Sequence, residues 1–285
     1  MAAVSFLIPA YNCADTLADA VDSILLQCLP EDAEIVILDD GSTDATADVA
    51  GAFAAASPRL VRTFANERNL GLGASRNRLV ELARFDVLYW LDADNVLPPN
   101  MAHQVLAPLW DGHAYAAAPR RICYFPQADR VTHEWLMANT GGWTTARDLL
   151  RSARVPAFDA NYAYRKDLFD LVGPYRPDAA LSDWTWGITA AMRGFEVRVM
   201  PGTFYLHRYS IGNESPTLWQ RDEQAGANDR AVATTLLDHI DAFDARSRRR
   251  IERLQGKSGL VENYIERGRL KLAATPWPKL PTAPP

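Results

Sequence analysis

The chain has 285 residues, of which 48% are hydrophobic and 23% are charged, and its formal net charge is −5. These are the values of an ordinary globular protein, long enough for one large α/β domain or two small ones. The acidic balance excludes a general nucleic-acid-binding protein, which needs a basic surface. The three cysteines lack metal-ligand spacing, which argues against structural zinc and against disulfides.

Apolar strands and amphipathic helices alternate along the first 94 residues. The residue pattern predicts strands at 4–8, 34–38, 60–64 and 86–91, and helices at 15–27, 43–53 and 73–82. Such an alternation is typical of an α/β fold with a doubly wound, mostly parallel sheet and helices on both faces.

The pattern loosens after residue 110. A helix is predicted at 184–193, a strand at 197–200, and helical structure from 216 to 255. The last residues, 275–285, are rich in proline and are expected to be disordered. We therefore expect an α/β domain over 1–215, a helical C-terminal extension over 216–272 and a Pro-rich tail over 273–285.

Polar residues follow three of the predicted strands, at 9–12, 39–42 and 92–94. The carboxyl ends of parallel strands share one edge of a sheet, where such folds bind ligands. Asp92 and Asp94 would bring two hard oxygen donors to that edge, which suits Mg²⁺ or Mn²⁺ completed by substrate phosphates. For this acidic tripeptide alone, a solvated turn is the alternative.

A glycine-containing segment, 69–77, lies between the second and third of these clusters. Its glycines permit close backbone approach, and Arg76 in the first turn of a helix suits a phosphate. The alternative for Arg76 is a surface charge paired with Glu81 or Asp86.

Five blocks resemble the family 2 glycosyltransferases of the GT-A fold, in order and in spacing. They are residues 5–12 (SFLIPAYN), 38–44 (LDDGSTD), 69–73 (NLGLG), 76–77 (RN) and 91–94 (LDAD). The resemblance covers residues 4 to about 215 and implies a Rossmann-like sheet. It also implies a metal-dependent transfer of sugar from a nucleotide diphosphate sugar, with UDP as the default nucleotide. The acceptor would be a saccharide, a lipid-linked molecule or a small molecule.

The resemblance also implies roles for individual residues. Asp40 is the expected partner of the base, and Asp92 and Asp94 are the expected metal and ribose contacts. His207 is the candidate third metal ligand, because a neutral imidazole can join two carboxylates on Mn²⁺. The nucleotide site would comprise Pro9, Ala10, Tyr11, Asn12, Asp39, Asp40, Gly71, Arg76, Asp92 and Ala93. The sugar and acceptor side would comprise Asn161, Tyr162, Trp184 and Arg208.

Asp183 matches the carboxylate that is the general base in inverting members of the family. An acceptor hydroxyl must lose its proton while it attacks the sugar, which requires such a base. Two positions depart from the family pattern: Ser182 replaces an acidic residue, and Leu79 replaces a glycine. The alternative for Asp183 is a helix N-cap that satisfies backbone donors.

Three rival functions remain open at this point. A retaining transferase would share every nucleotide motif and differ in the role of Asp183. A nucleotidyltransferase is disfavoured because no Gly-rich, Arg-bearing loop follows the first strand. A nucleotide-sugar-binding protein without catalysis would keep Asp40 and dispense with Asp183 and His207.

The segment 246–271 contains nine Lys and Arg against three Glu. It could dock on anionic lipid headgroups, where each basic residue contributes about 1 kcal/mol; the alternative is a solvated helix face. The N-terminus has no basic leader or cleavage site, and no apolar run approaches the roughly 20 residues that span a bilayer. We therefore expect a cytoplasmic protein, with peripheral contact to the inner membrane face as an open alternative.

Overall fold

The computed structural model describes residues 2–125, 130–135, 143–144, 161–177, 182–208 and 231–253. Its first part alternates strand and helix as predicted. The elements are β1 (Ala3–Ala10), α1 (Ala14–Leu25), β2 (Asp32–Asp39), α2 (Thr46–Ala56), β3 (Val61–Ala65), α3 (Leu72–Leu82) and β4 (Val87–Trp90). Strands β3, β2, β1 and β4 lie side by side in this order, and all three pairings are parallel. This confirms the predicted doubly wound half.

The second part adds strands of mixed direction to the same sheet. Its elements are α4 (Met101–Trp110), β5 (Ala116–Phe125), β6 (Arg130–Trp135), β7 (Trp143–Thr144), β8 (Ala163–Arg165), α6 (Lys166–Val172), α7 (Ser182–Met192) and β9 (Val197–Arg208). The sheet continues from β4 through β8, β5 and β9 to β7, with β6 paired to β5. Strand β8 is antiparallel to both β4 and β5, whereas β5 and β9 run parallel.

The predicted strand at 197–200 is longer in the structure, because β9 continues to Arg208. The β5–β9 pairing shifts register between Ala118 and Arg120, so that the partner in β9 passes from Val199 to Phe204 and residues 200–203 are skipped. Strands β5 and β8 had no distinctive pattern in the sequence. Their burial comes from neighbours that lie far away along the chain.

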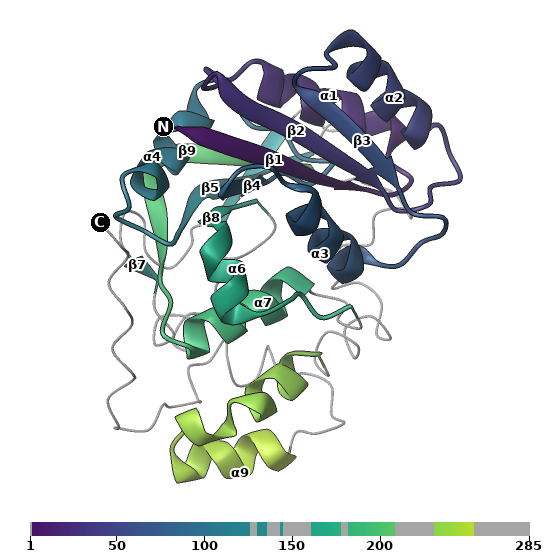
Figure 1. Cartoon of the computed structure of the whole chain (residues 1–285). Helices are drawn as coiled ribbons and strands as arrows, with labels where there is room; N and C mark the ends of the chain where they lie inside the picture. The colour runs from purple at the N-terminus through teal and green to yellow at the C-terminus, as the bar shows by residue number, and fades with distance from the viewer. Residues whose placement is uncertain are drawn as a thin grey trace.

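Helices cover both faces of the sheet (Figure 1). In β1, Phe6 and Ile8 belong to one hydrophobic cluster with residues of α1, α2 and α4. The intervening Leu7 belongs to the opposite cluster, with residues of α3, α6 and α7. Because successive side chains of a strand point to opposite faces, one apolar strand contributes to both cores. This arrangement confirms the expected fold class.

Of the expected C-terminal extension, the structure describes residues 231–253. Residues 231–238 are helical, and η2 (Ile240–Ala242) and α9 (Ala245–Arg253) follow. Figure 1 places α9 away from the sheet, beyond α7. The proline-rich tail lies outside the described residues, and the boundaries at 215 and 272 stay a prediction. In the part of the chain that is described, no helix is both long enough and apolar enough to cross a bilayer.

Candidate active site

A cavity of about 500 Å³ opens where β1, β4 and β9 end. Seven of the predicted site residues line it: Pro9, Tyr11, Asn12, Asp92, Ala93, Asp94 and Arg208. Sequence reasoning missed the other lining residues, Cys13, Ala14, Asp15, Thr16, Asp44 and Leu72. Four of them form the start of α1 and the residue before it. The signal was available, because a helix that begins directly after a strand brings its first turn to this edge of the sheet.

Backbone and side-chain hydrogen bonds hold the acidic loop after β4 in place. The Asp92 N–H donates to Asn161 Oδ1 over 2.9 Å, and the Asn95 N–H donates to the Asp92 carbonyl over 3.0 Å. Asn95 Oδ1 in turn accepts the Arg208 N–H over 3.2 Å. Asn95 and Asn161 are fully buried. The two asparagines therefore join the acidic loop to the residues just before β8 and to the end of β9.

Burial raises the pKa values of both carboxyl groups of this loop. For Asp92 the pKa rises to about 6, because burial and the charges of Asp94 and Asp183 outweigh the opposing effect of Arg76. For Asp94 burial raises the pKa, and Arg208 and Arg121 oppose the rise. Both side chains are partly exposed and line the cavity, and two carboxylate donors suit Mg²⁺ or Mn²⁺. The residues present therefore fit a divalent ion.

The pKa of His207 is lowered, whereas the pKa values of the two carboxylates are raised. Burial, and to a smaller extent Arg121, lower its pKa to about 3, so the imidazole is neutral at pH 7, the form that binds metals. Yet among the described residues no three His, Cys, Asp or Glu side chains gather closely enough to hold a metal ion. The structure thus does not bring His207 together with Asp92 and Asp94 as a three-donor set, and its role as third ligand stays a prediction.

Asp39 is the last residue of β2 and Asp40 follows it, and both organise the loops around the cavity. Asp39 Oδ1 accepts the Ser42 N–H, which closes the turn after the strand. Asp40 Oδ1 accepts Asn66 Nδ2 over 2.6 Å and the Leu70 N–H over 3.0 Å, and Oδ2 accepts the Gly71 N–H over 2.9 Å. Asp40 is 4% exposed. In this structure its carboxylate holds the loop at 66–71. A nucleotide base could therefore donate hydrogen bonds only to the carboxylate lone pairs that these three donors leave unused.

Two positions with positive φ shape the same loops. Asn12 has φ 48°, and its Oδ1 accepts the Thr43 N–H, so the turns after β1 and β2 are tied together. Gly41 has φ 72°, and a Cβ built there would lie 2.5 Å from the carbonyl carbon of Arg68. A side chain at Gly41 would therefore displace the Arg68 backbone.

Arg76 and Asp183 meet directly behind the acidic loop. Arg76 Nη1 lies 3.5 Å from Asp183 Oδ1 and donates to Ser182 Oγ over 3.2 Å. Arg76 Nη2 lies 3.3 Å from Asp92 Oδ1. The alternative of a surface charge paired with Glu81 or Asp86 is therefore wrong. Arg76 pairs with Asp92 and Asp183 because the orientation of α3 turns its side chain into the core, where Arg76 is 1% exposed.

The remaining predicted residues are largely buried around this pair. Tyr162 is fully buried, and its hydroxyl lies 2.7 Å from that of Tyr175. Asn161 is fully buried, Asp183 is 7% exposed, and Trp184 is 9% exposed. Asp183 is the second residue of α7 and not the residue before the helix. Asn161 contacts Asp92 and Asp183 contacts Arg76, but none of the four residues lines the 500 Å³ cavity.

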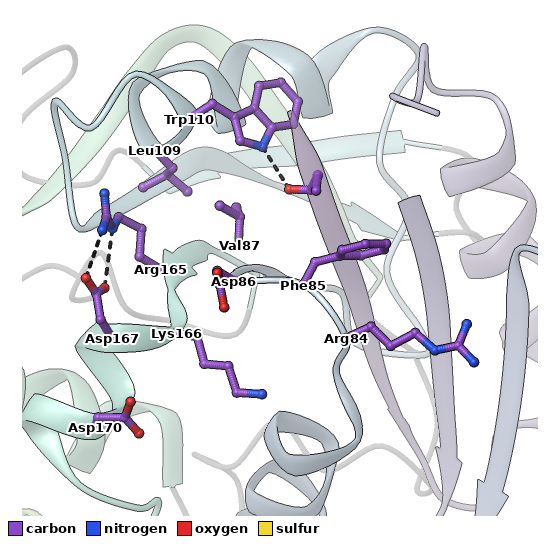
Figure 2. A pocket seen from close by; sticks show the side chains of 11 residues that line it. Arg84, Phe85, Asp86, Val87, Leu109, Trp110, Arg165, Lys166, Asp167 and Asp170 are labelled. Carbon is purple, nitrogen blue, oxygen red and sulfur yellow. Dashed lines mark hydrogen bonds and ion pairs between the residues drawn. The ribbon is translucent and has the colours of Figure 1, made fainter. Parts of the chain in front are cut away.

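A second hollow, of about 540 Å³, lies at the opposite edge of the sheet, where β1 and β4 begin (Figure 2). It is walled by charges of both signs, such as the Arg165–Asp167 ion pair of 2.9 Å. Trp110 Nε1 donates to the Ala3 carbonyl there over 2.9 Å. No predicted site residue lines this hollow, so it is separate from the candidate active site.

The sequence profile of the family described as Glycosyl transferase family 2 matches residues 5–174. This is more than half of the 285 residues, and the chain belongs to that family. The chain is similar to the succinoglycan biosynthesis protein ExoU of Rhizobium meliloti (strain 1021), with 40% identity over 104 residues, which cover 36% of this chain and 30% of ExoU. The chain spans about a third or less of the length of the curated relatives that it matches.

Solved structures match over most of the chain. TarS 1-349 of S. aureus in complex with UDP-GlcNAc gives a TM-score of 0.69 with 18% identity, and covers 91% of this chain and 73% of that chain. GalNAc-T7 with UDP, GalNAc and Mn²⁺ gives a TM-score of 0.63 with 19% identity, and covers 95% of this chain and 55% of that chain. These likenesses show the fold, which is that of GT-A glycosyltransferases.

Proposed function

We propose that this family 2 chain transfers a sugar from a nucleotide diphosphate sugar to an acceptor hydroxyl, with inversion at the anomeric carbon and Asp183 as the general base. A UDP-sugar is the preferred donor. The observation that carries the proposal is that one guanidinium, that of Arg76, contacts both Asp92 and Asp183. A candidate base thus lies next to the carboxylates expected to hold the donor.

The donor would occupy the 500 Å³ cavity. Tyr11 is 47% exposed at its wall and offers an aromatic face to a base. The diphosphate would lie near Arg208, since a guanidinium favours negative charge. Asp40 would act at the base end, partly by keeping the Leu70–Gly71 backbone in position.

The transfer step assigns roles to Asp183 and to the pair Asp92 and Asp94. Asp183 would accept the proton of the acceptor hydroxyl as that oxygen bonds to C1, while the bond from C1 to the diphosphate oxygen breaks and the electron pair leaves with the diphosphate. Asp92 and Asp94 would hold the divalent ion, which, when bound, neutralises charge on the leaving diphosphate. The Mn²⁺ in the GalNAc-T7 structure and the UDP-GlcNAc in the TarS structure support this choice of cofactor and donor.

The acceptor would be a saccharide, a lipid-linked molecule or a small molecule. The ExoU match supports polysaccharide biosynthesis as the setting. Peripheral membrane contact is part of the proposal for the C-terminal segment, because Arg246, Arg249 and Arg253 of α9 are exposed, whereas Ser247 and Ile251 are buried. With its apolar side covered, α9 would touch headgroups by charge alone.

Two experiments test the proposal. A thermal-shift screen of UDP-, GDP- and dTDP-sugars with Mn²⁺ should raise the melting temperature most for the true donor, because binding to the native state stabilises it. Nuclear magnetic resonance of the product then gives the anomeric configuration: inversion agrees with Asp183 as base, and retention would replace this mechanism with the retaining one. Binding of a donor without transfer to any saccharide acceptor would favour a nucleotide-sugar-binding protein.

A further inference from the structure

Arg76 is a buried cation enclosed by aromatic rings. Its guanidinium carbon lies 5.7 Å from the ring centroids of both Trp90 and Tyr175. Trp90, Tyr175 and Tyr162 are fully buried. Cations are attracted to the faces of aromatic rings, and the attraction is stronger where water is excluded. The rings therefore hold the guanidinium in one place.

The two ends of this guanidinium serve different parts of the site. One end points to Asp92, in the loop that follows β4, and the other points to Asp183 and Ser182, at the start of α7. One of these elements is a loop and the other is a helix, so no strand pairing joins them directly. A planar guanidinium presents its donors in a rigid fork, so it fixes the separation of the two carboxylates as well as neutralising them.

A direct contact between Arg76 and the donor phosphates does not fit this arrangement. Arg76 is 1% exposed and is absent from the wall of the 500 Å³ cavity. Arg208, in contrast, lines that cavity. Buried arginines that are already paired do not become available to a ligand without losing those pairs.

From this geometry we infer that Arg76 is a positioning residue, which sets the location of Asp183 relative to the donor and does not bind the donor itself. The inference rests on the proposed function, since it takes Asp183 as the base. It also gives Ser182 a role: a hydroxyl accepts one hydrogen bond from Arg76 and brings no charge that would draw the guanidinium away from Asp183.

The test compares Arg76→Gln and Arg76→Lys with the intact chain in two measurements. The first is the Kd of UDP with Mn²⁺ by calorimetry, and the second is kcat at saturating donor and acceptor. For Arg76→Gln we expect kcat to fall about 100-fold, since misplacing a catalytic group by about 1 Å has this effect, while the Kd stays within about threefold. For Arg76→Lys we expect a fall of about tenfold, because a point charge cannot pair with both carboxylates as a fork does.

Arg84→Gln is the matched control, since Arg84 lies just beyond α3 and its side chain is 59% exposed. It should leave both quantities unchanged. Circular dichroism and melting temperature report folding of each variant. If Arg76→Gln does not fold, Arg76→Lys alone decides, because it keeps the buried charge.

Two results would overturn the inference. One is a Kd raised tenfold or more with kcat preserved, which would make Arg76 a donor ligand. The other is a kcat within about threefold of the intact chain in a folded Arg76→Gln variant. Asp183→Asn, run in the same assay, separates the two proposals: if that variant retains turnover, the base assignment fails, whereas a dead Asp183→Asn with an active Arg76→Gln refutes only the positioning role.

Discussion

Asn77 and Tyr175 exchange two hydrogen bonds across the inner face of α3. Asn77 Nδ2 donates to the Tyr175 carbonyl over 2.9 Å, and the Tyr175 N–H donates to Asn77 Oδ1 over 2.8 Å. One amide side chain thus satisfies both polar groups of a single backbone residue. Tyr175 is also one of the rings that enclose Arg76. Asn77, which follows Arg76 in the sequence, therefore holds in place one of the rings that enclose Arg76.

Asn77→Ala should therefore destabilise the protein. Two backbone groups of Tyr175 would lose their partners, and an unmet buried polar group costs roughly 1–3 kcal/mol. Denaturant unfolding, with the midpoint and slope measured together, gives the free energy. Glu81→Ala, at an exposed position on the same helix, is the control and should change the free energy by no more than about 0.5 kcal/mol. An Asn77→Ala variant as stable as that control would contradict the role assigned to the pair.

Chelation should abolish sugar transfer, because a divalent ion held by Asp92 and Asp94 would neutralise the charge on the leaving diphosphate. Asp94→Ala should reproduce the chelated state and lower the affinity for UDP in the presence of Mn²⁺. Asp48→Ala, at an exposed position on α2, should change neither property. Calorimetric titration of UDP with and without Mn²⁺ measures the coupling. Full activity in excess EDTA would refute metal dependence.

Asp40→Ala and Asp183→Asn should separate binding from chemistry. Asp40→Ala removes the acceptor of three loop donors, so the Leu70–Gly71 backbone is released and nucleotide affinity should fall by roughly 1–3 kcal/mol. Asp183→Asn should keep nucleotide affinity and lose kcat, because proton abstraction matters only in the transition state. Equal losses of nucleotide affinity in both variants would show that the two roles are wrongly assigned.

Cys13 should react slowly with alkylating reagents although it lines the cavity. Burial raises the pKa of its thiol to about 11, and the hydrogen bond with Thr46 opposes the rise. A thiol whose pKa is raised is protonated over a wider pH range, so at pH 8 the reactive thiolate is about 100-fold scarcer than in an ordinary cysteine. The rate should increase as the pH approaches 11. Peptide mass spectrometry measures it, with the exposed Cys28 as internal reference; equal rates at pH 8 would contradict the prediction.

Charge reversal on α9 should test membrane contact. The triple variant Arg246→Glu, Arg249→Glu, Arg253→Glu should abolish sedimentation with anionic liposomes at low salt and leave nucleotide binding intact. The attraction is electrostatic and decays over about 10 Å at 0.1 M salt, so salt should also release the intact chain. Arg59→Glu, at an exposed position far from α9 in sequence, is the control. If the intact chain ignores such liposomes at low salt, α9 is a solvated helix.

The first half of the fold and the acidic edge were determined by the sequence itself. Apolar runs of strand length, helical periods and polar residues at strand ends are local features, so the pattern predicted β1 to β4 and α1 to α3 to within a few residues. Local patterns at the strand ends also indicated the cavity-lining residues Pro9, Tyr11, Asn12, Asp92 and Asp94, because the carboxyl ends of parallel strands must meet at one edge.

Only the tertiary structure decided how distant parts of the chain complete the site. Strand β8 enters the sheet antiparallel to both of its neighbours, β4 and β5, and this direction is set by packing and not by a local pattern. Arg76 and Ser182 are 106 positions apart, and their hydrogen bond depends on α3 and α7 packing on the same face of the sheet. The partner of a buried charge is set by which groups share its enclosure after water is excluded, and that is a property of the folded chain.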